Sequence, residues 1–153
     1  MSEPKPNWVA RQAACQIDAV FEDLLKAVQQ DVDAMNALPA ERRRYRHYVY
    51  QQQHERGAVV FCTDQAGTEL VTKYNVNIPM SVIFATAAAT SSIQIHQNLL
   101  QRVRDKAVTL SWNMETLSCG LIWDGQEDRR LEVWQVSQKA LGPLFFDTDD
   151  ADG

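Results

Sequence analysis

Residues 107–136 hold three short runs that decide the fold class, and these runs read AVTLSWN (107–113), LSCGLIW (117–123) and LEVWQV (131–136). β-Branched and aromatic residues fill each run and turn-forming residues separate them, which is typical of strands in an antiparallel meander. Hairpins centred near residues 117 and 128 would bring three tryptophans close to one cross-strand row: Trp112, Trp123 and Trp134. We expect this row to be either the core face of the sheet or an exposed platform for a partner.

A long amphipathic stripe precedes the meander. Residues 8–38 carry apolar side chains at the spacing of one helix face, with polar side chains on the other faces, and Asn7 is a favourable N-cap. A helix of this length spans roughly 45 Å at about 1.5 Å per residue, which is more than one small sheet covers. We therefore expect either a second helix along it or a homodimer, with Val20, Leu24 and Val28 at the dimer contact.

The segment after this stripe has two interpretations. Pro39 suits the first turn of a helix and Gly57 suits a C-terminal cap, so the pattern favours a second helix over residues 40–56. The alternative is a strand through residues 45–50, which are rich in tyrosine and have high β-propensity.

The middle of the chain mixes helical and extended patterns. Residues 58–63 and 68–74 are apolar or alternating runs around a turn, and they predict a hairpin. Residues 80–93 fit either a helix or strands, whereas residues 94–105 favour a helix. A short helix over residues 137–146, interrupted at Gly142-Pro143, closes the pattern.

In chain order these elements predict one α+β domain over residues 8–146. Its antiparallel β-sheet would have about five strands, ending in the Trp-bearing meander, and would be covered by a long N-terminal helical layer and a middle helix. Residues 1–7 predict a disordered lead-in, and residues 147–153 an acidic disordered tail.

Charge and composition limit the classes of function. The tail contributes −4 of the net charge of −5 through Asp147, Asp149, Asp150 and Asp152, which leaves −1 for the rest of the chain and no general basic footprint for nucleic acid. We expect no membrane association, because there is no apolar run of transmembrane length and no signal-peptide pattern at the start.

The cysteines suggest a compartment. Cys15, Cys62 and Cys119 are odd in number, widely spaced and set in apolar runs. This pattern predicts small buried side chains with free thiols in a reducing cytoplasm, and a chain of 153 residues can build its core without disulfides.

Recognisable catalytic or metal-binding patterns are missing from the sequence. His47 and His54 stand seven residues apart, too far to chelate one ion from a helix, so we expect no metal and no cofactor. An enzyme whose site is assembled in space from Cys62, His96 and nearby acids is kept as an alternative, because such adjacency is not visible in sequence.

The strongest charge feature is the run from Arg42 to Arg46, in which aromatic residues follow the arginines. Arginine and tyrosine are enriched in protein interfaces, and arginines can also grip phosphates. We therefore predict a small non-enzymatic cytoplasmic interaction protein, an adaptor, regulator or inhibitor. It would bind a protein partner of unknown identity through the Trp row or through a patch of Arg42, Arg43, Tyr45, Arg46 and Tyr48. The alternatives are a chaperone or immunity-type partner of a basic protein, acting through the acidic tail, and a nucleic-acid-binding regulator that uses the arginines.

Overall fold

Seven strands form one antiparallel sheet in which every strand pairs with its neighbour in the chain. The structure, a computed structural model, describes residues 5–53, 57–64, 80–87, 91–99 and 102–146. The strands are β1 (Arg46–Gln53), β2 (Gly57–Asp64), β3 (Ser81–Ala87), β4 (Ser92–Leu99), β5 (Arg102–Asn113), β6 (Ser118–Trp123) and β7 (Arg130–Leu131), and the helices are α1 (Trp8–Ala14), α2 (Ile17–Asn36) and α4 (Val133–Phe146). The α+β class is confirmed, but the sheet has seven strands rather than about five.

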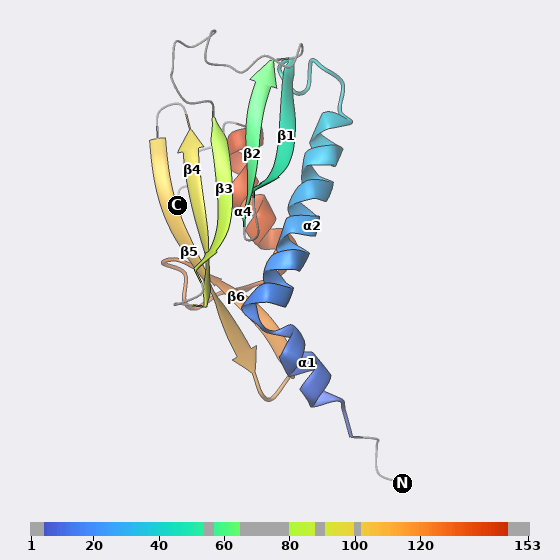
Figure 1. Ribbon diagram of the computed structural model, residues 1–153, viewed down its shortest axis with the longest axis vertical. Helices are drawn as coiled ribbons and strands as arrows, with labels where there is room; N and C mark the ends of the chain where they lie inside the picture. The colour runs from blue at the N-terminus through green and yellow to red at the C-terminus, as the bar shows by residue number, and fades with distance from the viewer. Residues whose placement is uncertain (1–4, 54–56, 65–79, 88–90, 100–101, 147–153) are drawn as a thin grey trace.

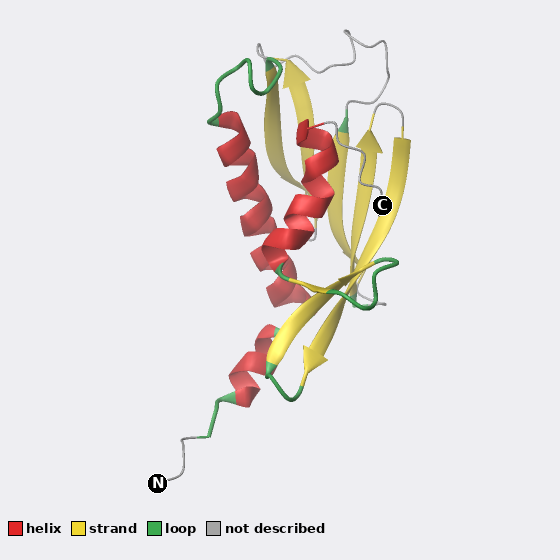
Figure 2. Ribbon diagram, turned by 180° about the vertical axis from the view of Figure 1, so that it is seen from behind, coloured by secondary structure: helices red, strands yellow, loops and turns green. Residues whose placement is uncertain are grey.

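The helices α2 and α4 pack on one face of the curved sheet and against each other (Figure 2). Side chains alternate between the two faces of a strand, so every second residue of β1 to β4 points toward the helices. Tyr48, Val60, Phe84 and Ile95 are examples, and each is at most 1% exposed. We call this side the inner face; the core lies between it and the two helices.

The predicted long N-terminal helix is two helices, α1 and α2, that meet at Cys15 and Gln16 (Figure 1). Asn7 caps α1 as expected, because its Oδ1 accepts a hydrogen bond from the Ala10 N–H at 3.1 Å. Alone among the three helices of the described chain, α1 buries no residue. The apolar stripe is therefore buried in the core along α2, whereas its continuation in α1 is not buried.

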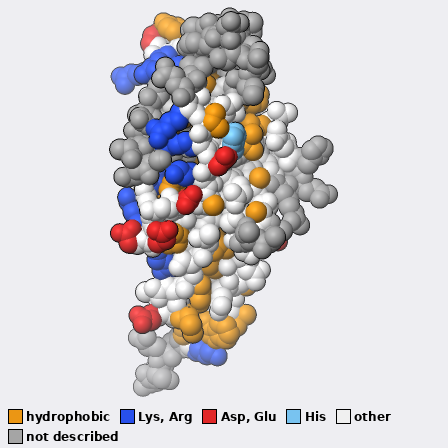
Figure 3. Space-filling model, turned by 90° about the vertical axis from the view of Figure 1, so that its left-hand side faces the viewer, with side chains coloured by type: hydrophobic (Ala, Val, Ile, Leu, Met, Phe, Trp, Pro, Cys, Tyr) orange, Lys and Arg blue, Asp and Glu red, His pale blue; other side chains and the backbone are white. Residues whose placement is uncertain are grey.

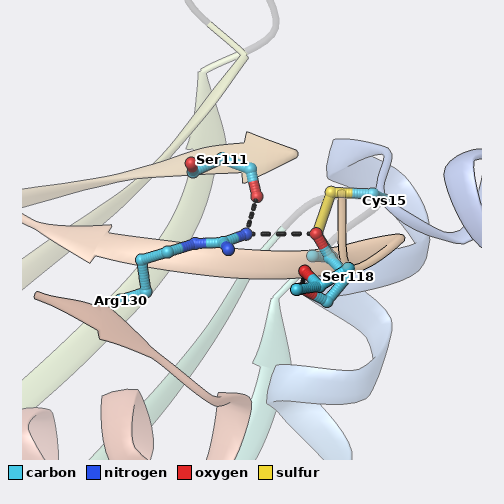
Figure 4. Close-up of a disulfide and its surroundings, with 6 residues drawn as sticks. Cys15, Ser111, Ser118 and Arg130 are labelled. Atoms are coloured by element: carbon cyan, nitrogen blue, oxygen red, sulfur yellow. Dashed lines mark hydrogen bonds between the residues drawn. A yellow bond between two sulfur atoms is a disulfide. The ribbon is translucent and has the colours of Figure 1, made fainter. Parts of the chain in front are cut away.

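The cysteine prediction is wrong for two of the three residues. Cys15 and Cys119 form a disulfide that ties the α1–α2 junction to β6, with the two Cα atoms 5.4 Å apart (Figure 4). Cys119 is exposed rather than buried. Only Cys62 is a buried free thiol. The pairing joins positions 104 residues apart, and it removes the reason from which a reducing compartment was inferred.

Beside the disulfide, Arg130 fastens the β5–β6 hairpin. Its Nη2 donates hydrogen bonds to the carbonyl oxygens of Ser111, at 2.7 Å, and Ser118, at 3.0 Å (Figure 4). The guanidinium lies across Gly120, where a Cβ atom would collide with it. Glycine at position 120 is therefore needed for this close approach.

The helix predicted over residues 40–56 is wrong, and the alternative strand is right. β1 pairs with β2 along its whole length, with Tyr48 opposite Cys62 and Tyr50 opposite Val60. This pairing buries alternate side chains of a tyrosine-rich segment, so tertiary burial decides between two similar local preferences.

The helix predicted over residues 94–105 is also wrong, since this segment forms parts of β4 and β5. The described part of residues 80–93 likewise follows its strand alternative, in β3 and the start of β4. Ile93, Ile95 and Gln97 alternate onto the inner face, and the buried Gln97 donates from Nε2 to the carbonyl oxygen of Ala140 in α4 at 2.9 Å. The strand expected over residues 58–63 is present as β2, whereas residues 68–74 lie outside the described residues.

The three tryptophans do not form one row. Both hairpins lie near their expected positions, since β6 also pairs with β7, but β7 has only two residues and α4 begins at Val133, so most of the third run is helical. Trp112 stands opposite Cys119 and Trp123 opposite Val108, which separates the two indoles along the hairpin. Trp123 is a core residue, 1% exposed, and Trp134 is 56% exposed on α4.

Candidate functional site

An apolar groove runs between α2 and α4. It has a volume of about 410 Å³. One wall of the groove includes Met35 of α2 and Leu38, which follows the end of that helix. The other wall includes Trp134, Leu141 and Phe146 of α4. A soluble domain seldom leaves several large apolar side chains around one hollow unless something binds there.

The spacing of residues in α4 explains how the groove arises. Val136, Ala140 and Leu144 repeat every four residues and are fully buried in the core. Trp134 and Phe146 lie near the two ends of the helix on its groove side, and they are 56% and 54% exposed. The helix is therefore apolar on two faces, and one of them is left unburied.

Two hydrogen bonds hold the polar groups around the groove. Ser137 Oγ of α4 donates to Asp31 Oδ2 of α2 at 2.6 Å, which links the two helices directly. Trp134 Nε1 donates to Glu132 Oε2 at 2.6 Å. This second bond fixes the orientation of the exposed indole and leaves its ring faces available for contact.

The charged residue that lines the groove is Asp31, and it belongs to an acidic helix, α2. This helix has five acids and one base, a net charge of −4, through Asp18, Glu22, Asp23, Asp31 and Asp33 against Lys26. By contrast, Lys139 is the single charged residue of α4. An apolar groove beside an acidic helix favours a ligand that combines apolar and basic groups.

The arginine run does not form one binding patch. Arg43 donates from Nε to the Leu38 carbonyl oxygen at 3.0 Å and from Nη1 to the Arg46 carbonyl oxygen at 2.7 Å, so it stabilises the turn that leads into β1. Arg46 is buried at 8% exposure. Arg42 and Tyr45 remain exposed. The run was expected on a helix, and the turn instead separates its members.

The tyrosines of this run serve the core. Tyr48 is 1% exposed, and its hydroxyl donates to the Phe145 carbonyl oxygen at 3.3 Å, while its ring packs edge-on against the Phe145 ring at 4.8 Å between centroids. Burial raises the pKa of Tyr50 above its usual range. Tyr48 therefore connects β1 to the end of α4 and is not a surface contact.

The structure does not bring Cys62 and His96 together. Cys62 is fully buried on the inner face of β2, whereas His96 stands on the opposite face of β4. His96 Nδ1 lies 2.5 Å from Asp105 Oδ1 on that outer face. The two residues named for an assembled catalytic site thus lie on opposite sides of the sheet.

The three residues expected at a dimer contact lie in the core of the single chain. Val20, Leu24 and Val28 are 5%, 0% and 0% exposed, and they face the sheet from α2. A homodimer of this fold would have to use other residues. The groove between α2 and α4 was missed from sequence because residues 131–136 were interpreted as a strand, which hid the helical spacing of Trp134 and Leu141.

Comparison with known proteins returns no match, whether with protein families, curated sequences or solved structures. Within the described ranges no helix has the length and apolar character to cross a membrane. The same residues contain no group of three or more His, Cys, Asp or Glu side chains placed to hold a metal ion. The function is therefore inferred from the geometry of the α2–α4 groove.

Proposed function

We propose that the protein acts by binding another protein, as an adaptor, regulator or inhibitor, and that an amphipathic helix with basic flanks occupies the α2–α4 groove. The observation that carries the proposal is the unburied apolar face of α4, with Trp134 more than half exposed beside Leu38 and Phe146. Tryptophan is among the residue types that contribute most to binding energy in protein interfaces. A helix that lays its apolar side into a groove is a common mode of peptide recognition.

The charge of the expected ligand follows from α2. Its net charge of −4 would attract basic residues on the flanks of a bound helix and raise the association rate. This sign agrees with the alternative of a partner for a basic protein, here through the acidic residues of α2. It disfavours nucleic acid at the groove, because phosphates would be repelled.

A model amphipathic helix of leucine and lysine, carrying a fluorescent label, tests the proposal by anisotropy titration. We expect Trp134→Ser to weaken its binding by about tenfold or more, which corresponds to about 1.4 kcal/mol. Trp8→Ser is the matched control, because Trp8 is also an exposed tryptophan, at 43%, but lies on α1. A leucine–glutamate peptide of the same pattern should bind more weakly than the leucine–lysine peptide. Equal loss in the two tryptophan variants, or equal binding of the two peptides, would reject the groove as the site.

The homodimer remains part of the proposal in a changed form, in which a second copy would use the exposed groove. Light scattering distinguishes a monomer of 17.4 kDa from a dimer. If a dimer forms, Trp134→Ser should dissociate it and the leucine–lysine peptide should compete with it. Dissociation without any peptide binding would support self-association and contradict a helical ligand.

The cytoplasmic location also remains a proposal, and the disulfide offers its test. A cytoplasmic protein would hold Cys15 and Cys119 reduced for most of its lifetime. Alkylation of the thiols in intact cells, followed by mass measurement, reports their state. Full protection of both cysteines from alkylation would place the protein in an oxidising compartment.

A further inference from the structure

The N-terminal half of β5 lies at an edge of the sheet. β4 pairs with β5 along Arg102–Thr109, but β6 pairs only with Val108–Asn113. Residues 103–107 therefore have a paired strand on one side, and no described strand pairs with them on the other. Figure 1 shows this part of β5 at the margin of the sheet. The exposed edge of a strand presents backbone N–H and C=O groups to any further strand.

At β1, the strand at the opposite edge of the sheet, a side chain covers part of the backbone. The Asn36 side chain of α2 reaches β1 near its start, where its Nδ2 donates to the Tyr48 carbonyl oxygen at 2.7 Å and its Oδ1 accepts from the Tyr48 N–H at 3.0 Å. One amide side chain thus takes the place of a neighbouring strand at Tyr48. No comparable contact covers the β5 edge among the described residues.

Three cations line the β5 edge on one face. Arg104 stands opposite Gln97, which points toward α4, so Arg102, Arg104 and Lys106 share the inner face at every second position. Lys139 of α4 lies on the same side of the sheet, since Gln97 Nε2 also donates to its carbonyl oxygen, at 3.4 Å. Lysine and arginine side chains gather along this side of the molecule in Figure 3.

The Arg104 side chain is oriented by β4, the strand on the paired side of β5. Its Nε donates to Gln97 Oε1 at 3.1 Å, which orients the guanidinium. Its Nη1 is buried and has no hydrogen-bond partner among the described residues. A carboxylate is the acceptor that best matches the geometry of an arginine side chain.

We propose that residues 103–107 form a strand-addition site for an extended acidic segment of a partner protein. The segment would pair with the outer backbone edge of residues 103–107, and carboxylates at every second position would lie beside the row of Arg102, Arg104 and Lys106. Alternation by two on both strands places the charges in register. This site is separate from the α2–α4 groove and does not depend on its function.

The positive charges also make pairing with a second copy of β5 unfavourable. A second copy of β5 would bring three cations against three cations, and like charges on paired strands are destabilising. The row thus protects the edge from self-pairing and aggregation while it accepts an acidic strand. A nucleic acid could use the cations, but it could not use the backbone edge, and this difference decides the test.

The test uses the full chain and a labelled peptide of alternating threonine and glutamate, with NMR measurement of amide hydrogen exchange. We expect binding that slows exchange at alternate amides within residues 103–107. Two control peptides, one with glutamine in place of glutamate and one N-methylated along a single backbone edge, should each bind about tenfold more weakly or worse. The N-methylated peptide keeps the charges and removes the hydrogen bonds of one edge, so it separates strand addition from simple charge attraction.

Two variants of equal charge change complete the test. Arg102→Gln with Lys106→Gln should weaken peptide binding by about tenfold, whereas Arg11→Gln with Lys26→Gln, on α1 and α2, should leave it unchanged. Arg104 is kept, because its bond to Gln97 contributes to the fold. Equal binding of the N-methylated peptide, equal loss in both double variants, or tighter binding of a single-stranded oligonucleotide that displaces the peptide would each overturn the proposal.

Discussion

The body of the molecule and its lower extension differ in what holds them together. The body consists of β1–β4, α2 and α4 around one apolar core, in which Leu24, Phe84 and Leu144 are fully buried. The extension consists of α1 and the tip of the β5–β6 hairpin, residues 111–119, and points away from the body in Figure 1. Trp8 and Met114 in the extension are 43% and 81% exposed, and α1 buries no residue.

The comparison shows two ways to order a polypeptide segment. Burial of apolar area stabilises the body, as in most domains. A helix of seven residues is only marginal in water, so α1 needs another constraint. The disulfide at Cys15 and the hydrogen bonds of Arg130 supply it, one covalent and one polar. The two regions should therefore respond differently to the same kinds of change.

The largest expected effect comes from a charge placed in the body. Leu24→Asp buries an unpaired carboxylate in the core, and we expect a loss of about 3–5 kcal/mol in the free energy of unfolding, or no folded protein at all. Ala13→Asp makes the same charge change on the exposed surface of α1 and should cost about 0.5 kcal/mol or less. Urea unfolding followed by circular dichroism measures both. A comparable loss from both substitutions would contradict the difference between the regions.

Removal of the disulfide should have the next largest effect. Cys15→Ser with Cys119→Ser should lower the free energy of unfolding by about 2–4 kcal/mol, because the crosslink constrains the unfolded chain. It should also accelerate amide exchange in α1 far more than in α2. Cys62→Ala is the control, since it removes a buried thiol from the body and should leave exchange in α1 unchanged. Unchanged exchange in α1 after loss of the disulfide would show that packing alone holds this helix.

A smaller effect is expected where a side chain covers a strand within the body. Asn36→Ala leaves the Tyr48 N–H and carbonyl without their side-chain partner, and should cost about 1–3 kcal/mol in the free energy of unfolding. Gln29→Ala, at an exposed position of the same helix, should cost about 0.5 kcal/mol or less. Thermal and urea unfolding report the difference. Equal values for the two variants would mean that water replaces the Asn36 amide without loss.

The smallest effect is expected from loss of the Arg130 hydrogen bonds in the extension. Gly120→Ala should displace the Arg130 guanidinium from the Ser111 and Ser118 carbonyls, at a cost of about 1 kcal/mol. Because the two changes disturb one contact, the double variant Gly120→Ala with Arg130→Ala should be no less stable than Arg130→Ala alone. Additive losses in this double-mutant cycle would show that the alanine methyl is harmful for another reason.

The parts of the fold that could be predicted are those with one strong local signal. The apolar stripe of α2 has a single helical interpretation, and Val20, Leu24 and Val28 are buried as such a stripe requires. The β5–β6 hairpin follows from β-branched runs on both sides of a turn. Residues 46–53 carry no such single signal, because their tyrosines suit a strand and their flanking Pro39 and Gly57 suit a helix.

The candidate sites were less visible because each depends on distant segments. The groove requires α2 and α4 to pack side by side, although Asp31 and Ser137 are 106 positions apart in the chain. The open edge of β5 exists only because β6 is shorter than β5. The arginine run, which was prominent in sequence, is divided by a turn in which Arg44 and Tyr45 have positive φ.

The sequence by itself determined the α+β class, the helical stripe of α2 and the apolar alternation that separates core from surface. These follow from side-chain periodicity, which acts between near neighbours. The tertiary structure alone decided that residues 46–53 and 92–99 are strands, that Cys15 meets Cys119, and that one face of α4 stays unburied. Each of these outcomes depends on contact with a segment that is distant in the chain. Local preferences do not specify the position of that segment, because it is set by the packing of the whole chain.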